Sequence, residues 1–332
     1  MNKVGKHIFI CSSLALSVAG TISTLSLIMT RKLVTIALDR EAPKVIGKSR
    51  EKLTGSANIS AITQLQNMVA AKLEQTQCEV VEISAQDGTT LVGHLHRCKH
   101  AKRTIIAMHG WRSSWSKDFG MIADFLFENK CNVLFAEQRG QGLSGGNHMS
   151  FGLKERYDCL DWISWIGTQA FRDLPIYLAG ISMGASTVLM TGGFSLPEQV
   201  KGIVADCGFT SPYDIWRHIA ENNLNIPYGQ LRDYTVTRLC RKRIHLDPKS
   251  YSCVDAMHSC QVPVLFIHGT DDCFVPIEMT YENYKACTAP KRLFIVPGAQ
   301  HGMSYVVDKS GYEATILKFW HDCERNIKKA AP

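Results

Sequence analysis

Short apolar runs alternate with helical patterns from about residue 104 to residue 328, and this alternation limits the chain to one class of fold. Strands are expected over residues 104–109, 132–136, 175–179, 200–205, 262–268 and 292–296. Helices are expected over 116–129, 153–168, 183–192 and 311–328. Continuously apolar strands are buried on both faces, which is typical of a mostly parallel sheet with helices on each side. The sequence therefore predicts an α/β fold.

The boundaries of this domain follow from the segments around the alternation. Residues 78–84 and 91–98 flank Asp87-Gly88 and are expected to form an antiparallel hairpin. About residues 210–258 interrupt the alternation with apolar and aromatic side chains, and this insertion is expected to form a cap over the site. Over 56–77, apolar positions recur every three or four residues, which predicts an amphipathic helix. The α/β domain is thus placed at residues 76–328.

The N-terminal part of the chain has a different character. Residues 7–30 contain no Asp, Glu, Lys or Arg, and a helix of these 24 residues would be roughly 36 Å long, enough to cross a bilayer. We predict a membrane anchor over residues 1–30, followed over 31–75 by a basic stalk and the amphipathic helix. The alternative is a signal peptide cleaved near Ser17-Val18-Ala19. The apolar run continues well beyond Ala19, which favours the anchor.

The expected location is therefore the cell membrane, with the lipid bilayer as a partner of the N-terminal helix. Basic residues are more numerous after the apolar segment than before it, which favours a cytoplasmic domain. A signal anchor would instead place the domain outside. The face of the membrane and the oligomeric state both stay open.

Charge and cysteine content narrow the choice of other partners. The net charge is +7, but residues 1–55 hold nine Lys and Arg against three acids, so the rest of the chain is nearly neutral and nucleic acid is not expected. Eleven of the twelve cysteines follow the apolar segment without paired spacing, which predicts free thiols. His94, His96 and Cys98 alternate along one strand but lack zinc-site spacing. No metal and no cofactor are expected.

One turn carries the main chemical signal. Gly180-x-Ser182-x-Gly184 lies between an apolar strand and a helix, so Ser182 is expected at the tip of a sharp turn with its hydroxyl exposed. The N-terminus of the following helix favours negative charge there. The motif alone is short, and its meaning depends on the residues that the fold brings near it.

A serine nucleophile needs a base, and the base needs an orienting acid. Asp272 follows the 262–268 strand and His301 follows the 292–296 strand, so both are expected at the carboxyl end of the sheet, where Ser182 also lies. Asp271 and Asp206 are rival acids, and the spacing to Val275-Pro276 favours Asp272. At the end of the 104–109 strand, the N–H of Trp111 is expected to form an oxyanion hole with the N–H of Met183.

Five motifs together resemble the α/β-hydrolase superfamily. They are Gly180-x-Ser182-x-Gly184, His109-Gly110, Glu137-x-Arg139-Gly140-x-Gly142-x-Ser144, Gly269-x-x-Asp272-x-x-Val275-Pro276 and His301-Gly302. More closely, the chain is similar to bacterial membrane-anchored serine hydrolases grouped with esterases, lysophospholipase-like enzymes and serine aminopeptidase-type hydrolases. The resemblance implies an α/β-hydrolase fold with Ser182 as nucleophile, His301 as general base, Asp272 as its orienter, and Trp111 and Met183 as oxyanion donors. Glu137 stands where an aspartate is more usual, in a turn that is structural.

The expected function is hydrolysis of a carboxylic ester, with an acyl ester as substrate and an acyl-enzyme as intermediate. Hydrolysis of a peptide or a thioester uses the same residues, and a peptidase or aminopeptidase-type amide hydrolase is the main alternative. A membrane-tethered binding protein without catalysis is a third hypothesis, which the complete Ser-Asp-His set disfavours. Fold alone does not select among them.

Overall fold

The centre of the molecule is one eight-stranded sheet. The computed structural model describes residues 24–41 and 59–330, and its strands follow the order β1-β2-β4-β3-β5-β6-β7-β8. They are β1 (Glu79–Ser84), β2 (Thr90–His96), β3 (Arg103–Met108), β4 (Cys131–Ala136), β5 (Ile176–Ile181), β6 (Val200–Asp206), β7 (Val264–Gly269) and β8 (Lys291–Val296). β2 runs antiparallel to β1 and β4, and the strands from β4 to β8 pair in parallel. The mostly parallel sheet is as predicted.

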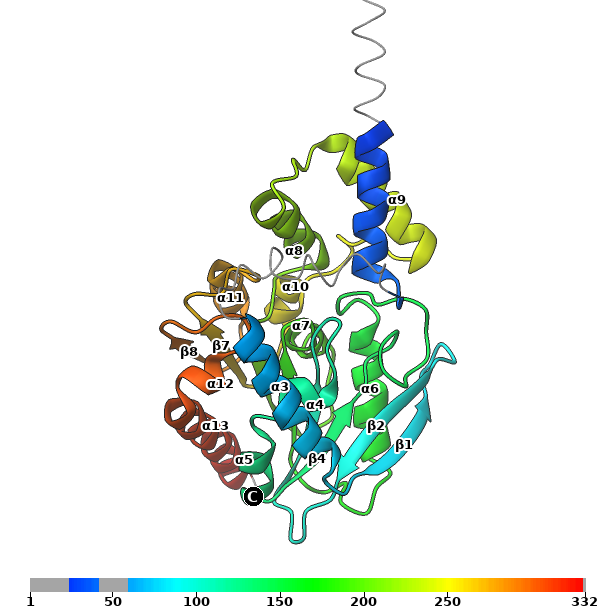
Figure 1. Cartoon of the computed structure of the whole chain (residues 1–332). Helices are drawn as coiled ribbons and strands as arrows, with labels where there is room; N and C mark the ends of the chain where they lie inside the picture. The colour runs from blue at the N-terminus through cyan, green and yellow to red at the C-terminus, as the bar shows by residue number, and fades with distance from the viewer. Residues whose placement is uncertain (1–23, 42–58, 331–332) are drawn as a thin grey trace, which may run out of the picture.

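Helices cover both faces of this sheet (Figure 1). Outside the segment between β6 and β7, the helices that follow the β1-β2 hairpin are α4 (Trp115–Phe119), α5 (Ala123–Glu128), α6 (Glu155–Ile166), α7 (Met183–Thr191), α11 (Ile277–Ala286), α12 (Ser304–Val307) and α13 (Lys309–Ala330). Side chains of β3 alternate between two cores: Ile106 packs with the α6 and α7 residues, and Ile105 packs with those of α4, α5 and α13. This alternation follows from the two-residue period of a strand.

Two helical segments differ from the sequence prediction in their extent. The helix expected over 116–129 is divided into α4 and α5, with Gly120, a weak helix former, at the break. The amphipathic helix is α3 (Ile59–Glu74), which lies against α4. It therefore packs on the domain, as its apolar stripe predicted.

Between β6 and β7 the chain leaves the sheet. This segment forms α8 (Pro212–His218), a π-helix η2 (Ile219–Asn223), α9 (Gln230–Arg243) and α10 (Cys253–Ser259). We refer to α8, η2 and α9 as the cap helices. In Figure 1 they stand beyond the carboxyl ends of the strands, whereas α10 lies close to α7 and α11.

Residues 24–38 form a single helix that crosses the expected boundary between anchor and stalk at residue 30. Thr30, Val34 and Leu38, spaced by four, are 1%, 4% and 0% exposed, so one face of this helix is buried in the protein. In Figure 1 it runs beside the cap helices. Residues 31–38, expected in a polar stalk, are thus part of the folded body.

The predicted anchor lies mostly outside the described residues, because residues 1–23 are not among them. Within residues 24–41 and 59–330, no helix has the length and apolar character needed to span a bilayer. The eleven cysteines in this part of the chain are all free thiols, as predicted.

Gly184 offers a test of how tightly the turn after β5 is packed. A Cβ atom at this position would lie 1.8 Å from the Met108 carbonyl oxygen. We expect Gly184→Ala to destabilise the fold by at least about 3 kcal/mol, because a backbone clash in a close-packed core cannot relax cheaply. Urea unfolding measures this change. Gly229→Ala is the control, since an added Cβ there meets nothing within 4 Å, and an equal effect of the two changes would contradict the packing argument.

Candidate active site

Ser182 lies at a strained turn between β5 and α7. Its backbone has φ 57° and ψ −118°, a region that residues with a side chain rarely adopt. The Ser182 N–H donates to the Asp206 carbonyl oxygen at 2.9 Å, which helps to hold the turn. Ser182 stands at the carboxyl end of β5, as the sequence predicted, but it is only 8% exposed, so the expected exposed hydroxyl lies instead at a cavity.

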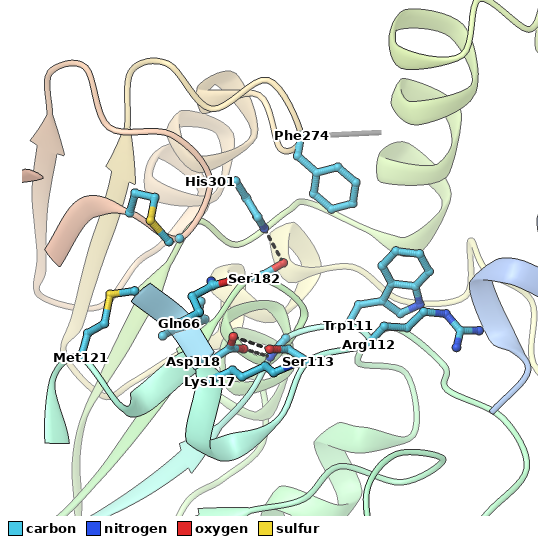
Figure 2. Close-up of a pocket in the computed structure, with 14 residues that line it drawn as sticks. Gln66, Trp111, Arg112, Ser113, Lys117, Asp118, Met121, Ser182, Phe274 and His301 are labelled. Carbon is cyan, nitrogen blue, oxygen red and sulfur yellow. Dashed lines mark hydrogen bonds between the residues drawn. The ribbon is translucent and has the colours of Figure 1, made fainter. Parts of the chain in front are cut away.

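His301 joins Ser182 to Asp272. Its Nε2 lies 2.9 Å from Ser182 Oγ, and its Nδ1 lies 2.7 Å from Asp272 Oδ2. His301 stands in the loop between β8 and α12, and Figure 2 shows its ring pointing at the serine hydroxyl. Three residues that are far apart in the sequence therefore form one hydrogen-bonded chain.

The second oxygen of Asp272 is fixed by the backbone. Asp272 Oδ1 accepts hydrogen bonds from the N–H groups of Phe274 and Val275, both at 2.9 Å. The buried His268 approaches Oδ2 with its Nε2 at 3.2 Å and also contacts the Val275 carbonyl oxygen. These contacts hold the carboxylate with Oδ2 directed at His301.

The two rival acids have other partners. Asp271 is exposed and accepts from the Thr270 hydroxyl. Asp206 is buried, and its carboxyl oxygens pair with Ser304 Oγ and with the Tyr312 hydroxyl, both at 3.2 Å. Neither rival is hydrogen-bonded to His301 in the described part of the chain.

The electrostatics of Asp272 and His301 are coupled. Burial acts to raise the pKa of Asp272, but the neighbouring His301 and His268 outweigh it and hold that pKa well below its usual range. Burial acts to lower the pKa of His301, whereas the charge and hydrogen bond of Asp272 raise it, and the result is a pKa well above the ordinary value. This is the pattern of a base whose protonated form is stabilised by an acid.

The turn after β3 lies against Ser182. A Cβ atom on Gly110 would be 3.3 Å from Ser182 Cβ, so only a residue without one fits here comfortably. The Gly110 N–H donates to Asp118 Oδ2 at 2.6 Å, and Figure 2 shows Asp118 also bonded to Ser113. Asp118 thereby fixes the turn that leads into Trp111.

Two backbone N–H groups remain near Ser182. Met183 is the first residue of α7, a position whose N–H has no partner within an α-helix. Among the described residues, no backbone hydrogen bond uses the Trp111 N–H. Both N–H groups therefore lack a backbone partner, and their role as oxyanion donors stays a prediction.

A cavity of about 210 Å³ opens at Ser182. Gln66 from α3 and Lys117 from α4 contribute polar groups, while Phe274 and Met303 contribute apolar ones (Figure 2). The serine hydroxyl is therefore reachable from a pocket of mixed polarity.

Arg112 was not identified from the sequence. It has φ 50° and donates from its guanidinium to the carbonyl oxygens of Ile36, Asp39 and Arg40, at the end of the helix of residues 24–38. A cation at a helix C-terminus is favourable, and these bonds also satisfy terminal carbonyl groups. The residue next to Trp111 therefore connects the active-site turn to the N-terminal helix.

We expect Arg112→Ala to destabilise the protein by about 2 kcal/mol and to lower ester turnover roughly tenfold, because hydrogen bonds from a charged donor contribute about 1.5–3 kcal/mol. Urea unfolding and steady-state kinetics measure the two effects. Arg241→Ala serves as the control, since Arg241 forms an exposed pair with Asp247 that is worth little. Equal changes in stability and in turnover for Arg112→Ala and Arg241→Ala would show that the Arg112 hydrogen bonds do not stabilise the protein.

Cys207, Asp272 and His301 bring one metal-binding atom each within 4.8 Å of one another. Burial raises the pKa of Cys207 to about 11, so its thiol is neutral and a poor ligand. Asp272 and His301 already bind each other. The cluster therefore belongs to the hydrogen-bonded chain rather than to a separate metal centre.

The chain is similar to several known proteins. Residues 99–222 match the family model described as serine aminopeptidase, S33. The uncharacterized protein YqkD of Bacillus subtilis is 28% identical over 256 residues, covering 76% of this chain and 82% of that protein. Among solved structures, the Pyrococcus furiosus esterase Pf2001 is 21% identical with a TM-score of 0.62, covering 76% of this chain and 93% of its own.

Est1E of Butyrivibrio proteoclasticus, solved with ferulic acid bound, is 20% identical with a TM-score of 0.54, covering 73% of this chain and 99% of its own. The similarity to these two solved structures is a similarity of fold. The family match also spans β3, β4, β5 and α7, the elements that lead to Trp111 and Ser182. The fold and this match both support a place for the chain in the α/β-hydrolase superfamily.

Proposed function

We propose that this protein is a serine hydrolase that cleaves carboxylic esters. The observation that carries the proposal is the hydrogen-bonded chain from Asp272 through His301 to Ser182, next to the N–H groups of Trp111 and Met183. A nucleophile, a base, an orienting acid and two oxyanion donors are the groups that acyl transfer requires.

The reaction begins when Ser182 Oγ attacks the ester carbonyl carbon and its proton passes to His301 Nε2. The carbonyl oxygen becomes an oxyanion, which accepts hydrogen bonds from the Trp111 and Met183 N–H groups. His301 then gives the proton to the alcohol oxygen, the bond to that oxygen breaks, and the acyl group stays on Ser182. Water then attacks the acyl carbonyl carbon and gives one proton to His301 Nε2. The bond from this carbon to Ser182 Oγ breaks, His301 returns the proton to Oγ, and the carboxylic acid leaves.

The match to the serine aminopeptidase model makes amide hydrolysis the second candidate. An aminopeptidase needs a carboxylate to bind the free ammonium group of its substrate. Among the described residues that line the cavity at Ser182, Asp118 is the one carboxylate, and it already accepts from Gly110 and Ser113. This arrangement, together with the esterases among similar structures, favours an ester.

A fluorophosphonate probe and a matched pair of substrates test the proposal. We expect the probe to modify the full chain on the peptide that contains Ser182, as located by mass spectrometry. We also expect turnover of p-nitrophenyl butanoate and far slower turnover of alanine p-nitroanilide. Preference for the anilide would make the protein a peptidase. Absence of both labelling and turnover would make it a binding protein.

We also propose that the N-terminal segment binds the cell membrane. Leu25, Ile28 and Met29 are 61%, 48% and 40% exposed at the start of the helix of residues 24–38, and they belong to the last part of the apolar run of residues 7–30. Exposed apolar side chains in a row are costly in water and favourable in lipid. Flotation of the full chain with phospholipid vesicles tests this, and a chain that stays at the bottom of the gradient would refute it.

A further inference from the structure

A second, larger cavity lies between the N-terminal helix and the cap. It has a volume of about 470 Å³, and its lining is almost entirely apolar. The helix of residues 24–38 forms one wall, with Val34 and Ala37 among its lining residues, and the cap helices form the other, with Trp216 and Ala220. We call this cavity the acyl pocket. Its size is within the range of small-molecule sites.

The wall made by the N-terminal helix is fixed at several points. Near its C-terminus, the Trp111 indole N–H donates to the Ala37 carbonyl oxygen at 2.9 Å. Further toward its N-terminus, Arg232 of α9 donates to the Thr30 hydroxyl at 3.1 Å. Between these points, Arg243 donates to the Thr35 hydroxyl at 2.8 Å. Side-chain hydrogen bonds from Trp111 and from two arginines of α9 therefore hold this wall of the acyl pocket in place.

The acyl pocket adjoins the cavity at Ser182. Trp111 and Phe274 line both this pocket and the cavity at Ser182, and their rings lie nearly parallel with centroids 6.5 Å apart. The Phe274 ring centroid is also 5.0 Å from that of His301. In Figure 2 both aromatic rings stand on the same side of Ser182, opposite Gln66 and Lys117. An acyl group on Ser182 therefore has two aromatic rings on one side, and Gln66, Lys117 and Met121 on the other.

We propose that the acyl pocket holds the acyl chain of the ester substrate, so that the helix of residues 24–38 is part of the substrate site and the substrates are esters of medium-chain and long-chain fatty acids. The inference rests on the proposed ester hydrolysis at Ser182. It assigns the smaller cavity of mixed polarity at Ser182, which Gln66 and Lys117 line, to the alcohol part of the ester. The pocket lies along residues 29–38 of the helix, a length of roughly 13 Å, which is much more than an acetyl group needs.

The proposal predicts a steep dependence on chain length. Burying one methylene group is worth about 0.8 kcal/mol in transfer free energy, so kcat/KM is expected to rise by up to about fourfold for each methylene that enters the pocket. With the full-length protein, p-nitrophenyl esters from acetyl to dodecanoyl, kept below their micelle concentrations, measure this rise. Free dodecanoate is expected to inhibit competitively at far lower concentration than acetate.

Two substitutions fill the acyl pocket from opposite walls. Ala37→Phe adds a ring from the N-terminal helix and Ala220→Phe adds one from the cap, and each is expected to lower the ratio of dodecanoyl to acetyl kcat/KM by at least tenfold. Lys32→Phe is the matched control, because it adds the same ring on the exposed side of the same helix. It is expected to leave that ratio unchanged. Turnover of the acetyl ester shows that each variant is folded.

The outcomes separate the two proposals. Turnover of the acetyl ester without any rise toward longer chains would overturn the acyl pocket and leave ester hydrolysis standing. Equal ratios of dodecanoyl to acetyl kcat/KM in the wild type, in Ala37→Phe and in Ala220→Phe would also overturn the acyl pocket. Absence of turnover on every ester, together with absence of probe labelling, would instead remove the proposed function itself. If one of the two phenylalanine variants does not fold, the variant on the other wall and the inhibition by dodecanoate still test the acyl pocket.

Discussion

Ser182→Ala is expected to reduce kcat/KM for p-nitrophenyl esters by about a million-fold, which corresponds to roughly 8 kcal/mol of transition-state stabilisation. The reason is that, in the proposed mechanism, the change removes the atom that attacks the carbonyl carbon and passes its proton to His301. Some acceleration should persist, because the oxyanion donors and the binding pockets remain. Steady-state kinetics with burst-phase titration of active sites measures the loss.

The fold should tolerate this change. The Ser182 hydroxyl contacts His301 and lies in a pocket, so its removal leaves no buried group without a partner other than the histidine nitrogen. Ser186→Ala is a useful comparison, since Ser186 stands one turn further along α7 and its hydroxyl contacts the Phe209 backbone. That variant should lose stability but still react with a fluorophosphonate. A Ser182→Ala protein that keeps even one percent of wild-type turnover would show that another residue is the nucleophile.

The sheet and the hydrogen-bonded chain were accessible from sequence because their signals are local. Most strands of the sheet contain a short apolar run. Ser182 directly follows β5, Asp272 lies three residues after β7, and His301 lies five residues after β8. Parallel strands place their carboxyl ends at one edge, so the order of elements was enough to bring the three residues together. The five motifs also restricted the choice among nearby acids.

The helix of residues 24–38 shows where local signals mislead. Its first residues are apolar and its later ones include Arg31 and Lys32, a pattern that resembles an anchor followed by a basic stalk. The four-residue spacing of Thr30, Val34 and Leu38 was the available sign of a buried face. The cap contacts this helix through Arg232 and Arg243, which are about 200 residues away in the sequence. A single sequence does not reveal such contacts.

Arg112 escaped notice for a related reason. An arginine after His-Gly-Trp has no local feature that separates it from an ordinary surface residue, and its partners near residue 36 are 72 to 76 positions away. Its role depends entirely on tertiary contact. A fragment that starts after residue 58 would lack both these partners and one wall of the acyl pocket, so the catalytic domain is better studied with residues 24–41 present.

Asp272→Asn is expected to lower kcat about ten-thousand-fold, because it places the wrong tautomer on His301. The N–H groups of Phe274 and Val275 would select the amide oxygen for the Oδ1 position, which puts the amide NH2 opposite His301 Nδ1. That nitrogen must then accept a hydrogen bond, so its proton moves to Nε2 and points at Ser182. The ring can no longer take the serine proton.

The pH dependence of the residual activity gives an independent check on this assignment. Only the neutral ring acts as a base, so wild-type activity falls as pH drops through the raised pKa of His301. Removing the Asp272 charge lowers that pKa, and the acidic limb of the pH profile should therefore shift to lower pH. Asp206→Asn and Asp271→Asn are the controls, because neither carboxyl is bonded to His301. If Asp206→Asn caused the large loss and the shift while Asp272→Asn did not, the orienting acid would be Asp206.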